Sequence, residues 1–582
     1  MIIQALVSLY DRLAENQTKE LPTEGYAEQR ASFAIVLGDN GKMLQLKDLR
    51  TQSGKKLVPE MLLLPSIGRS GSGFFPQFMW DNTQYVLGAV AVDEKKDKPD
   101  EIARKQQRAL EAFESFRDFH HRHLDRCNSP AVKSFLAFLD HWKPEMAEGL
   151  ENWKEVAGAN IVFMHGNRSF IHEEPEVRGI WEKLCEERDD GEIGFCLLTG
   201  ERRKLARLHP MMKNVDGAQA TAAIVSFNKE AFCSYGKEQS YNAPLGPVAA
   251  FKYTAALNYL LRRTANPQRM KVGDSTTIFW TKRASPVEEF LGFALGANDE
   301  AADATDRRQV ELFLTAVRQG TRPLIPDFDG DVEFYILGLA PNSSRLAVRF
   351  WYACTVAELM KQLGKHFGNL EMERCFEHDP LNPGIWELLK ETARETKDIS
   401  PVLGGELMRS ILEGVAYPMS IYHGVLNRIR VENDPKRRKV SYLRAAILKA
   451  VLTRNYKMEV PMSLDKSKTD IGYLMGRLFA VLEKAQSDAL GNVNATIKDR
   501  FWGAASSTPA SVFPRLLNLG QHHIAKAQFG IASDNVIREI MESIPAFPAR
   551  LSLQEQGMFA IGYYQQRNDL YRKNENKENK GE

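Results

Sequence analysis

Apolar residues follow two different periods along this chain, and the change of period constrains the fold more than any other feature of the sequence. Up to about residue 355, short strand-like apolar runs are interleaved with helical segments. Beyond about residue 400, apolar residues recur almost only at the spacing of one helix face. We therefore predict an α+β fold, in which a mixed α/β N-terminal region with antiparallel hairpins precedes an all-α C-terminal helical bundle.

Turn-forming residues place the elements of the N-terminal region. A helix is predicted over residues 2–14 from the spacing of its apolar residues. Two apolar runs then flank an Asp-Asn-Gly turn at residues 39–41. Because Asn-Gly supplies the positive φ angles of a tight turn, a β-hairpin is predicted over residues 32–49. A second hairpin is predicted from the apolar runs 332–339 and 345–352.

The chain is too long for one hydrophobic core, because single cores stop growing at roughly 250–300 residues. We expect a mixed α/β region over residues 1–355, a helical connector over 356–400 and the helical bundle over 401–572. The last residues, 573–582, have no apolar side chain, and a disordered tail is predicted there.

Composition excludes several classes of protein. The net charge of +2 is far from that of a histone-like nucleic-acid binder, and the basic clusters at 202–207 and 436–439 are interpreted first as solvated surface. No apolar run reaches the roughly 18–20 residues of a membrane span, so no membrane contact and a cytoplasmic location are expected. The six cysteines form no C-x-x-C pair, so we predict no disulfide framework, structural metal or cofactor.

Two motifs resemble catalytic sites but lack essential parts. The glycine-rich loop 68–73 is followed by Phe74 and Phe75, whereas a P-loop requires Lys and then Ser or Thr. This loop is therefore either an ordinary surface turn or a flexible basic loop that contacts phosphates and base edges. His378-Asp379 resembles the dipeptide of metal-dependent phosphohydrolases, yet the proline and glycine residues that follow favour a plain turn. We expect a non-catalytic protein, and a phosphohydrolase or nuclease that uses His378 and Asp379 is the alternative.

Three histidines, His120, His121 and His123, are crowded on a segment that is predicted to be helical. Their side chains point in different directions around such a helix, so they cannot converge on one metal ion. We expect them at the protein surface.

Several blocks of the sequence resemble the large-subunit family of type I-C CRISPR effector complexes, in the same order along the chain. The first block is RSGSGFFPQFMWDNTQYVLG at residues 69–88, and the longer second block includes VSFNKEAFCSYGKEQSYNAP at residues 225–244. The later blocks are FYILGLAPNSSRLAVRFW at 334–351, GYLMGRLFAVLEKAQ at 472–486 and IKDRFWGAASSTPASVFPRLL at 497–517. The resemblance covers most of the chain.

The resemblance implies a non-catalytic subunit of an RNA-guided surveillance complex (Cascade). In such a complex the guide RNA reads the target by base pairing, while the large subunit reads a short flanking motif in double-stranded DNA and promotes strand opening. The implied partners are the guide CRISPR RNA, the double-stranded DNA target, the backbone and guide-processing subunits, and a helicase-nuclease that cleaves the target.

We expect the flanking motif to be read by the glycine-rich loop and the residues after it. Arginine and asparagine make bidentate contacts to base edges, and glycine permits a close approach of the backbone. A wedge residue, taken to be Phe74, Phe75 or Gln77, is expected to separate the first base pair. The predicted DNA-contacting residues are Arg69, Ser70, Gly71, Ser72, Phe74, Phe75, Gln77, Asp81 and Asn82.

Two further sets of residues receive roles from the resemblance. A set rich in amides and hydroxyls either forms a polar network that holds two substructures together or contacts the guide RNA or DNA; it comprises Asn228, Lys229, Tyr235, Lys237, Gln239 and Asn242. A basic set in the bundle is predicted to hold the displaced DNA strand through salt-sensitive phosphate contacts, with surface solubility as the competing interpretation. It comprises Arg477, Lys498, Arg500 and Arg515.

The resemblance also suggests that a small subunit is made from the same message by an internal translation start. Met458 and Met462 precede the fourth block, so the small-subunit-like part is expected from about residue 458. The competing interpretation is that both methionines are ordinary core or loop residues.

Overall fold

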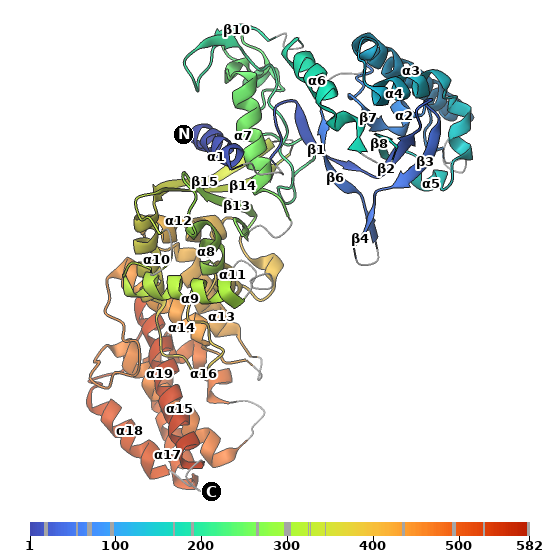
Figure 1. Cartoon of the computed structure of the whole chain (residues 1–582). Helices are drawn as coiled ribbons and strands as arrows, with labels where there is room; N and C mark the ends of the chain where they lie inside the picture. The colour runs from blue at the N-terminus through green and yellow to red at the C-terminus, as the bar shows by residue number, and fades with distance from the viewer. Residues whose placement is uncertain are drawn as a thin grey trace. The chain divides into compact units, whose positions relative to one another are not determined.

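The computed structural model of the chain forms two compact units (Figure 1). The first comprises residues 1–212 and 225–259, and the second comprises residues 213–224 and 260–582. This division differs from the predicted boundary at residue 355, because strands before that residue belong with the C-terminal helices. The structure describes residues 1–16, 21–53, 56–66, 73–92, 98–166, 169–187, 191–263, 267–295, 304–323, 325, 328–343, 345–433, 437–491, 496–527 and 530–578.

A five-stranded sheet lies at the centre of the first unit, with the strand order β3-β2-β8-β7 and β9 beside β8. Strand β2 pairs with β3 in antiparallel and with β8 in parallel register, and all of its residues are buried. The β2–β3 pair confirms the predicted hairpin over residues 32–49. The strands are β2 (Phe33–Leu37), β3 (Met43–Asp48), β7 (Trp80–Asn82), β8 (Asn160–His165) and β9 (Ser169–Phe170).

Helices α3 (Pro99–Leu124) and α4 (Pro130–His141) supply an aromatic core that packs against this sheet. The ring of Phe135 on α4 lies 6.3 Å from that of Phe116 on α3 and 4.6 Å from that of Phe163 on β8, edge to face in both cases. Buried aromatic pairs of this kind combine a large apolar area with a defined geometry. They therefore fix helices and sheet in one arrangement.

The remaining elements of the first unit include three two-stranded sheets, which pair β1 with β6, β4 with β5 and β10 with β11. Helices α1 and α7 lie side by side, and an ion pair joins them, in which Lys252 Nζ donates to Asp11 Oδ1 at 2.7 Å. The bounds are α1 (Ile2–Glu15), β1 (Tyr26–Ala31), β4 (Thr51–Ser53), β5 (Lys56–Val58), β6 (Glu60–Pro65), α2 (Thr83–Val86), α5 (Trp153–Val156), α6 (Pro175–Glu187), β10 (Ile193–Phe195), β11 (Arg202–Lys204) and α7 (Pro247–Leu260).

The second unit begins with a four-stranded antiparallel sheet in the order β12-β13-β14-β15. Its β14–β15 hairpin confirms the second predicted hairpin. The register shifts after Gly338, where a Cβ atom would overlap the ring of Phe350, so glycine lets this ring pack against the strand. The strands are β12 (Arg269–Val272), β13 (Ser275–Thr281), β14 (Glu333–Asn342) and β15 (Arg345–Thr355).

The predicted helical bundle follows and is confirmed, with helix α15 (Ile471–Leu490) at its centre (Figure 1). Every residue of α15 from 472 to 485 is buried. Gly472 and Gly476 let this helix approach α19 closely, since a Cβ atom at either would overlap a backbone carbonyl of α19. The helices that pack on α15 are α16 (Ile497–Ala505), α17 (Pro509–Lys526), α18 (Gly530–Glu542) and α19 (Leu553–Glu578).

Buried cations of helix α14 hold the ends of two neighbouring helices. Lys449 Nζ donates to the carbonyl of Gly368 at 3.3 Å, and Arg454 donates to that of Ser410 at 2.7 Å. Carbonyls at a helix C-terminus lack partners within the helix and attract positive charge, so these contacts stabilise α10 and α12. The helices here are α8 (Val287–Ala294), α9 (Ala304–Gln319), α10 (Val356–Leu370), α11 (Ile385–Lys390), α12 (Leu403–Glu413), α13 (Met419–Val431) and α14 (Tyr442–Tyr456).

The C-terminal end differs from the predicted tail over 573–582, because α19 continues to Glu578. Residues 579–582 lie outside the described residues. Within the described part of the chain, no helix is both long enough and apolar enough to cross a membrane.

Candidate nucleic-acid contacts

The segment after the glycine-rich loop is held by a buried carboxylate. Asp81 is 1% exposed, and its two oxygens accept hydrogen bonds from the backbone N–H groups of Gln77 at 3.0 Å and Asn82 at 2.8 Å. The Asn82 side chain caps helix α2 by accepting from the N–H of Gln84 at 3.0 Å. These residues therefore shape the backbone that follows the loop.

The buried side chain of His120 also holds this segment. Met79 has a φ angle of 65°, in the left-handed region that non-glycine residues rarely adopt. Its N–H donates to His120 Nε2 at 2.8 Å, while His120 Nδ1 lies 2.7 Å from the carbonyl oxygen of Phe116. Nδ1 therefore carries the proton and the ring is neutral. Burial lowers the pKa of His120 to about 3.

The position of His120 corrects the expectation that the three crowded histidines lie at the surface. His120 is buried, and the ring of Phe78 stacks against it at 5.7 Å. Phe78 also stacks on Trp181, with ring centroids 5.1 Å apart. On the other side of the loop, the indole N–H of Trp80 donates to the carbonyl of Pro65 at 2.6 Å. Phe78 and Trp80 thus anchor the segment after the glycine-rich loop in the core, and Trp80 also holds Pro65 before the loop.

The structure corrects the predicted exposure of part of the DNA-contacting set. Gln77 is only 5% exposed and Asp81 is buried, so neither side chain is presented to a base edge. Of the three wedge candidates, Phe75 has the exposed ring, while Phe74 is half-buried beneath Arg108. Arg69, Ser70, Gly71 and Ser72 lie outside the described residues.

A second candidate site is a tight turn at residues 234–237. Tyr235 and Gly236 both have positive φ angles, 54° and 69°, and the N–H of Lys237 donates to the carbonyl of Ser234 at 3.0 Å. Two positive φ angles at the centre of a turn are the signature of type I′ geometry. The turn displays the Tyr235 side chain, which is 99% exposed.

Asn242 supports this turn from within. Its side-chain oxygen accepts from the N–H of Ser234 at 2.9 Å, and its side-chain nitrogen donates to the carbonyls of Lys237 at 2.8 Å and Gln239 at 3.0 Å. Gln239 is itself strained, with a φ of 47°. Asn242 thus fits the predicted polar network, whereas Asn228, Lys229, Tyr235 and Lys237 are exposed.

In the helical bundle, one predicted strand-binding residue lies in the core. Arg477 is 1% exposed; its Nε donates to Gln566 at 3.0 Å, and a terminal nitrogen lies 3.2 Å from a carboxylate oxygen of Glu539. This burial corrects its predicted place in an exposed groove. Lys498 is half-buried, and Arg500 and Arg515 are exposed, so contacts with a DNA strand stay predictions for these three.

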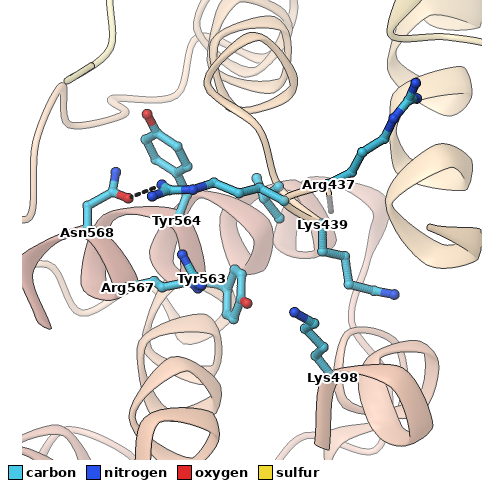
Figure 2. Close-up of a pocket in the computed structure, with 9 residues that line it drawn as sticks. Arg437, Lys439, Lys498, Tyr563, Tyr564, Arg567 and Asn568 are labelled. Carbon is cyan, nitrogen blue, oxygen red and sulfur yellow. Dashed lines mark hydrogen bonds between the residues drawn. The ribbon is translucent and has the colours of Figure 1, made fainter. Parts of the chain in front are cut away.

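Lys498 lines a cavity of about 100 Å³ between the segment 437–440 and helices α16 and α19 (Figure 2). The described residues that line this basic cavity include five cations and no acid. They are Arg437, Arg438, Lys439, Val440, Lys498, Tyr563, Tyr564, Arg567 and Asn568. Figure 2 shows Arg437 pointing away from the other labelled cations; it also lines a neighbouring hollow of about 420 Å³.

The sequence does not reveal this cavity, because a basic run such as 436–439 predicts solvated surface. Lys439 is instead 3% exposed, and its Nζ donates to the carbonyl of Glu432 at 2.8 Å. The Arg438 guanidinium donates to Asn568 Oδ1 at 3.1 Å. Helix α19 lines the other half of the cavity with Tyr563, Tyr564 and Arg567, whose spacing places them close together on the helix. This spacing can be read from the sequence, but the sequence does not show that these residues lie against the distant basic run.

His378 and Asp379 form the turn that their neighbours favour. The Asp379 carboxylate accepts from the N–H groups of Cys375 at 2.9 Å and Phe376 at 3.0 Å, and the His378 ring stacks on that of Phe376 at 5.0 Å. Among the described residues, no group of three or more His, Cys, Asp or Glu side chains is arranged to hold a metal ion.

Comparison with known proteins identifies the family. No curated protein matches the chain. A family model described as CRISPR-associated protein (Cas_Csd1) matches residues 6–571. This match includes the anchored segment after the glycine-rich loop, the Tyr235 turn and the basic cavity of the bundle. The chain therefore belongs to the Csd1 family of CRISPR-associated proteins.

Proposed function

We propose that this protein is the non-catalytic large subunit of a type I-C CRISPR RNA-guided surveillance complex, in which it recognises the motif that flanks a double-stranded DNA target. Family membership supports a role in CRISPR defence. The observation that carries the finer proposal is the double anchoring of the segment 73–82 by Asp81 and His120. A strained backbone held by two buried groups is typical of a functional loop that must keep one shape.

Motif recognition is tested with the assembled complex on duplexes that differ only in the flanking motif. We expect Arg69→Glu to weaken binding to the correct motif and to leave complex assembly and stability unchanged. Phe75→Ala should reduce strand opening, measured by the reactivity of unpaired thymines, because its exposed ring is the available wedge. Arg126→Glu, at an exposed position on the same unit, is the matched control. Wild-type binding by Arg69→Glu would refute this assignment.

The Tyr235 turn is the proposed contact with the 5′ end of the guide RNA or with a neighbouring subunit. Exposed aromatic rings stack on unpaired bases, and the nearby lysines suit a phosphate backbone. Tyr235→Ala should weaken guide-RNA retention by the complex, whereas Tyr235→Phe should preserve it because the stacking face is unchanged. Asn242→Ala should act like Tyr235→Ala, since it removes the support of the turn. If all variants retain the guide RNA equally well, this contact is refuted and the residues form only a polar network within the protein.

Cleavage is assigned to another protein, a helicase-nuclease that the complex recruits. The contacts of Asp379 support this, because its carboxylate accepts from two backbone N–H groups and so stabilises a turn. Purified protein should not cleave DNA or RNA with Mg²⁺ or Mn²⁺ present. Sustained cleavage that His378→Ala abolishes would overturn the non-catalytic proposal.

A further inference from the structure

We propose that the basic cavity of the bundle binds one phosphate group of a single-stranded nucleic acid, next to an aromatic platform formed by Phe376 and His378. This proposal rests on the proposed function in one respect: the single strand is taken to be the displaced DNA strand. The new part is a defined site for that strand, with a phosphate pocket and a stacking surface.

The first step is the charge of the cavity. Lys439 is nearly fully buried and donates to a neutral carbonyl, so its charge is not balanced by that contact. Burial is the main cause that lowers its pKa, and the carboxylates of Asp499 and Glu432 oppose this effect while the charge of Lys498 adds to it. Removing positive charges from water without full compensation costs free energy, and a bound anion would recover part of that cost.

The second step is the weak compensation from neighbouring groups. Lys498 lies 3.6 Å from Glu483, whose carboxylate is shared with the hydroxyl of Tyr563. The Arg567 guanidinium lies 4.5 Å from the ring centroid of Tyr571, in a cation–π contact. Two carboxylates outside the lining thus act on the five lining cations: Glu483 acts on Lys498 and Arg567, and Asp499 acts on Lys439, which also lies near Glu432. The lining cations still outnumber these acids. Such a site favours a ligand with at least one full negative charge.

The third step is size. A cavity of about 100 Å³ accommodates a tetrahedral phosphate, whereas pockets for whole drug-sized ligands span roughly 300–1,000 Å³. The larger hollow beside it shares Arg437 and Arg438, and its lining adds the cations Lys390, Arg394 and Arg444 and the acids Glu391 and Glu395. Because cations outnumber acids there, a chain of phosphates can continue along the surface. A polymer with phosphates along its backbone therefore fits better than a free nucleotide.

The fourth step is the aromatic platform. The Arg438 guanidinium, which lines the cavity, lies 4.4 Å from the ring centroid of Phe376. Phe376 is 44% exposed, and the exposed His378 ring stacks on it with an interplanar angle of 9°. Exposed rings next to a phosphate site provide a surface on which unpaired bases stack, as single-strand binding requires. A duplex hides its base faces, so the platform indicates a single strand.

The experiment measures binding of a fluorescent oligothymidine to purified full-length protein across a chloride salt series. The test variants are Arg438→Gln with Lys498→Gln, and Phe376→Ala alone. Arg409→Gln is the control, since Arg409 is an exposed α12 arginine paired with Glu413 four residues later. Thermal unfolding of each variant checks that the fold is preserved, and the single variants Arg438→Gln and Lys498→Gln replace the double variant if it is unstable.

We expect the double variant to bind about tenfold more weakly, the effect of losing a charge-assisted contact. Its salt dependence should be shallower by about 0.7 in the log–log slope, because one phosphate contact is lost. Phe376→Ala should weaken oligothymidine binding without changing that slope. The control should match wild type.

Inorganic phosphate, compared with chloride at equal ionic strength, separates the two possible sources of the anion. Under the proposal, phosphate competes with oligothymidine for the wild type but not for the double variant. If phosphate binds wild type alone while all variants bind oligothymidine equally, the cavity takes a free anion and the strand proposal is overturned. Wild-type oligothymidine binding by the double variant also overturns it. Either result leaves the motif test with Arg69→Glu unaffected, so the two failures are distinguishable.

Discussion

At the scale of single residues, His120 ties stability to pH. Its pKa is about 3 in the folded protein, chiefly through burial, and about 6.5 in an unfolded chain. The unfolded state therefore binds the extra proton first, and stability is fully present above about pH 6.5 and falls as the pH drops toward 3. Protonation would also place an N–H at Nε2, opposite the N–H of Met79.

We predict that the segment 73–82 loses protection against hydrogen exchange as the pH falls below about 6.5, by up to about 1.4 kcal/mol per pH unit. Hydrogen exchange, corrected for intrinsic rates, measures the opening free energy of this segment at several pH values. His120→Gln should lower protection at neutral pH and flatten its dependence on pH. A dependence as steep as that of wild type would show that His120 is not the titrating group.

Asp81 leads to a second prediction at this scale. Asp81→Ala removes the acceptor of the buried N–H group of Gln77 and of the partly buried N–H group of Asn82, which should cost about 2–3 kcal/mol. Asn82→Ala removes only a helix cap and should cost about 1 kcal/mol. Urea unfolding measures both. We expect Asp81→Ala to weaken motif binding together with stability, whereas Arg69→Glu affects binding alone; an Asp81→Ala protein as stable as wild type would contradict this structural role.

At the scale of elements, the α15–α19 contact depends on glycine. A Cβ atom at Gly476 would overlap the carbonyl oxygen of Phe559 and lie 2.8 Å from the backbone nitrogen of Tyr563. Backbone atoms cannot rotate away, so Gly476→Ala should force the helices apart and destabilise the unit by about 1–3 kcal/mol.

Gly503→Ala is the matched control for this prediction. A Cβ atom there meets nothing within 4 Å, and alanine is the better helix former, so stability should rise by up to about 1 kcal/mol. The unfolding midpoints of the two variants should therefore move in opposite directions. A Gly476→Ala midpoint at or above that of wild type would contradict the close helix contact.

Some features of these elements can be predicted from the sequence, and others cannot. Both hairpins were predictable because their turns consist of adjacent residues whose backbone preferences are local. The role of the glycines of α15 cannot be predicted from the sequence, because the backbone that requires them lies on α19. Likewise, the sequence predicts a base-contacting role for Asp81 because it carries no measure of burial; the acceptor role of Asp81 follows from the fold of its own segment.

At the scale of the whole molecule, a small subunit made from an internal start stays a prediction, and the second unit contains the helices that such a product would need. Met458 lies two residues after the end of α14, and the described helices from α15 to α19 lie entirely after it. A product that starts at Met458 keeps the carbonyl of Pro461, which accepts from the side chain of Gln565 at 2.8 Å. A product that starts at Met462 lacks this contact, so the earlier start yields the better-anchored bundle.

We predict that expression of the full gene produces a second, shorter polypeptide, whose N-terminus is identified by intact-mass measurement. Replacing both Met458 and Met462 by leucine should remove the short product and preserve the long one, because leucine keeps a similar apolar volume at each position. Met458→Leu alone should remove it if the anchored product is the one made. Persistence of the short product in the double variant would place its origin elsewhere, such as proteolysis, and would leave the bundle as a part of one chain only.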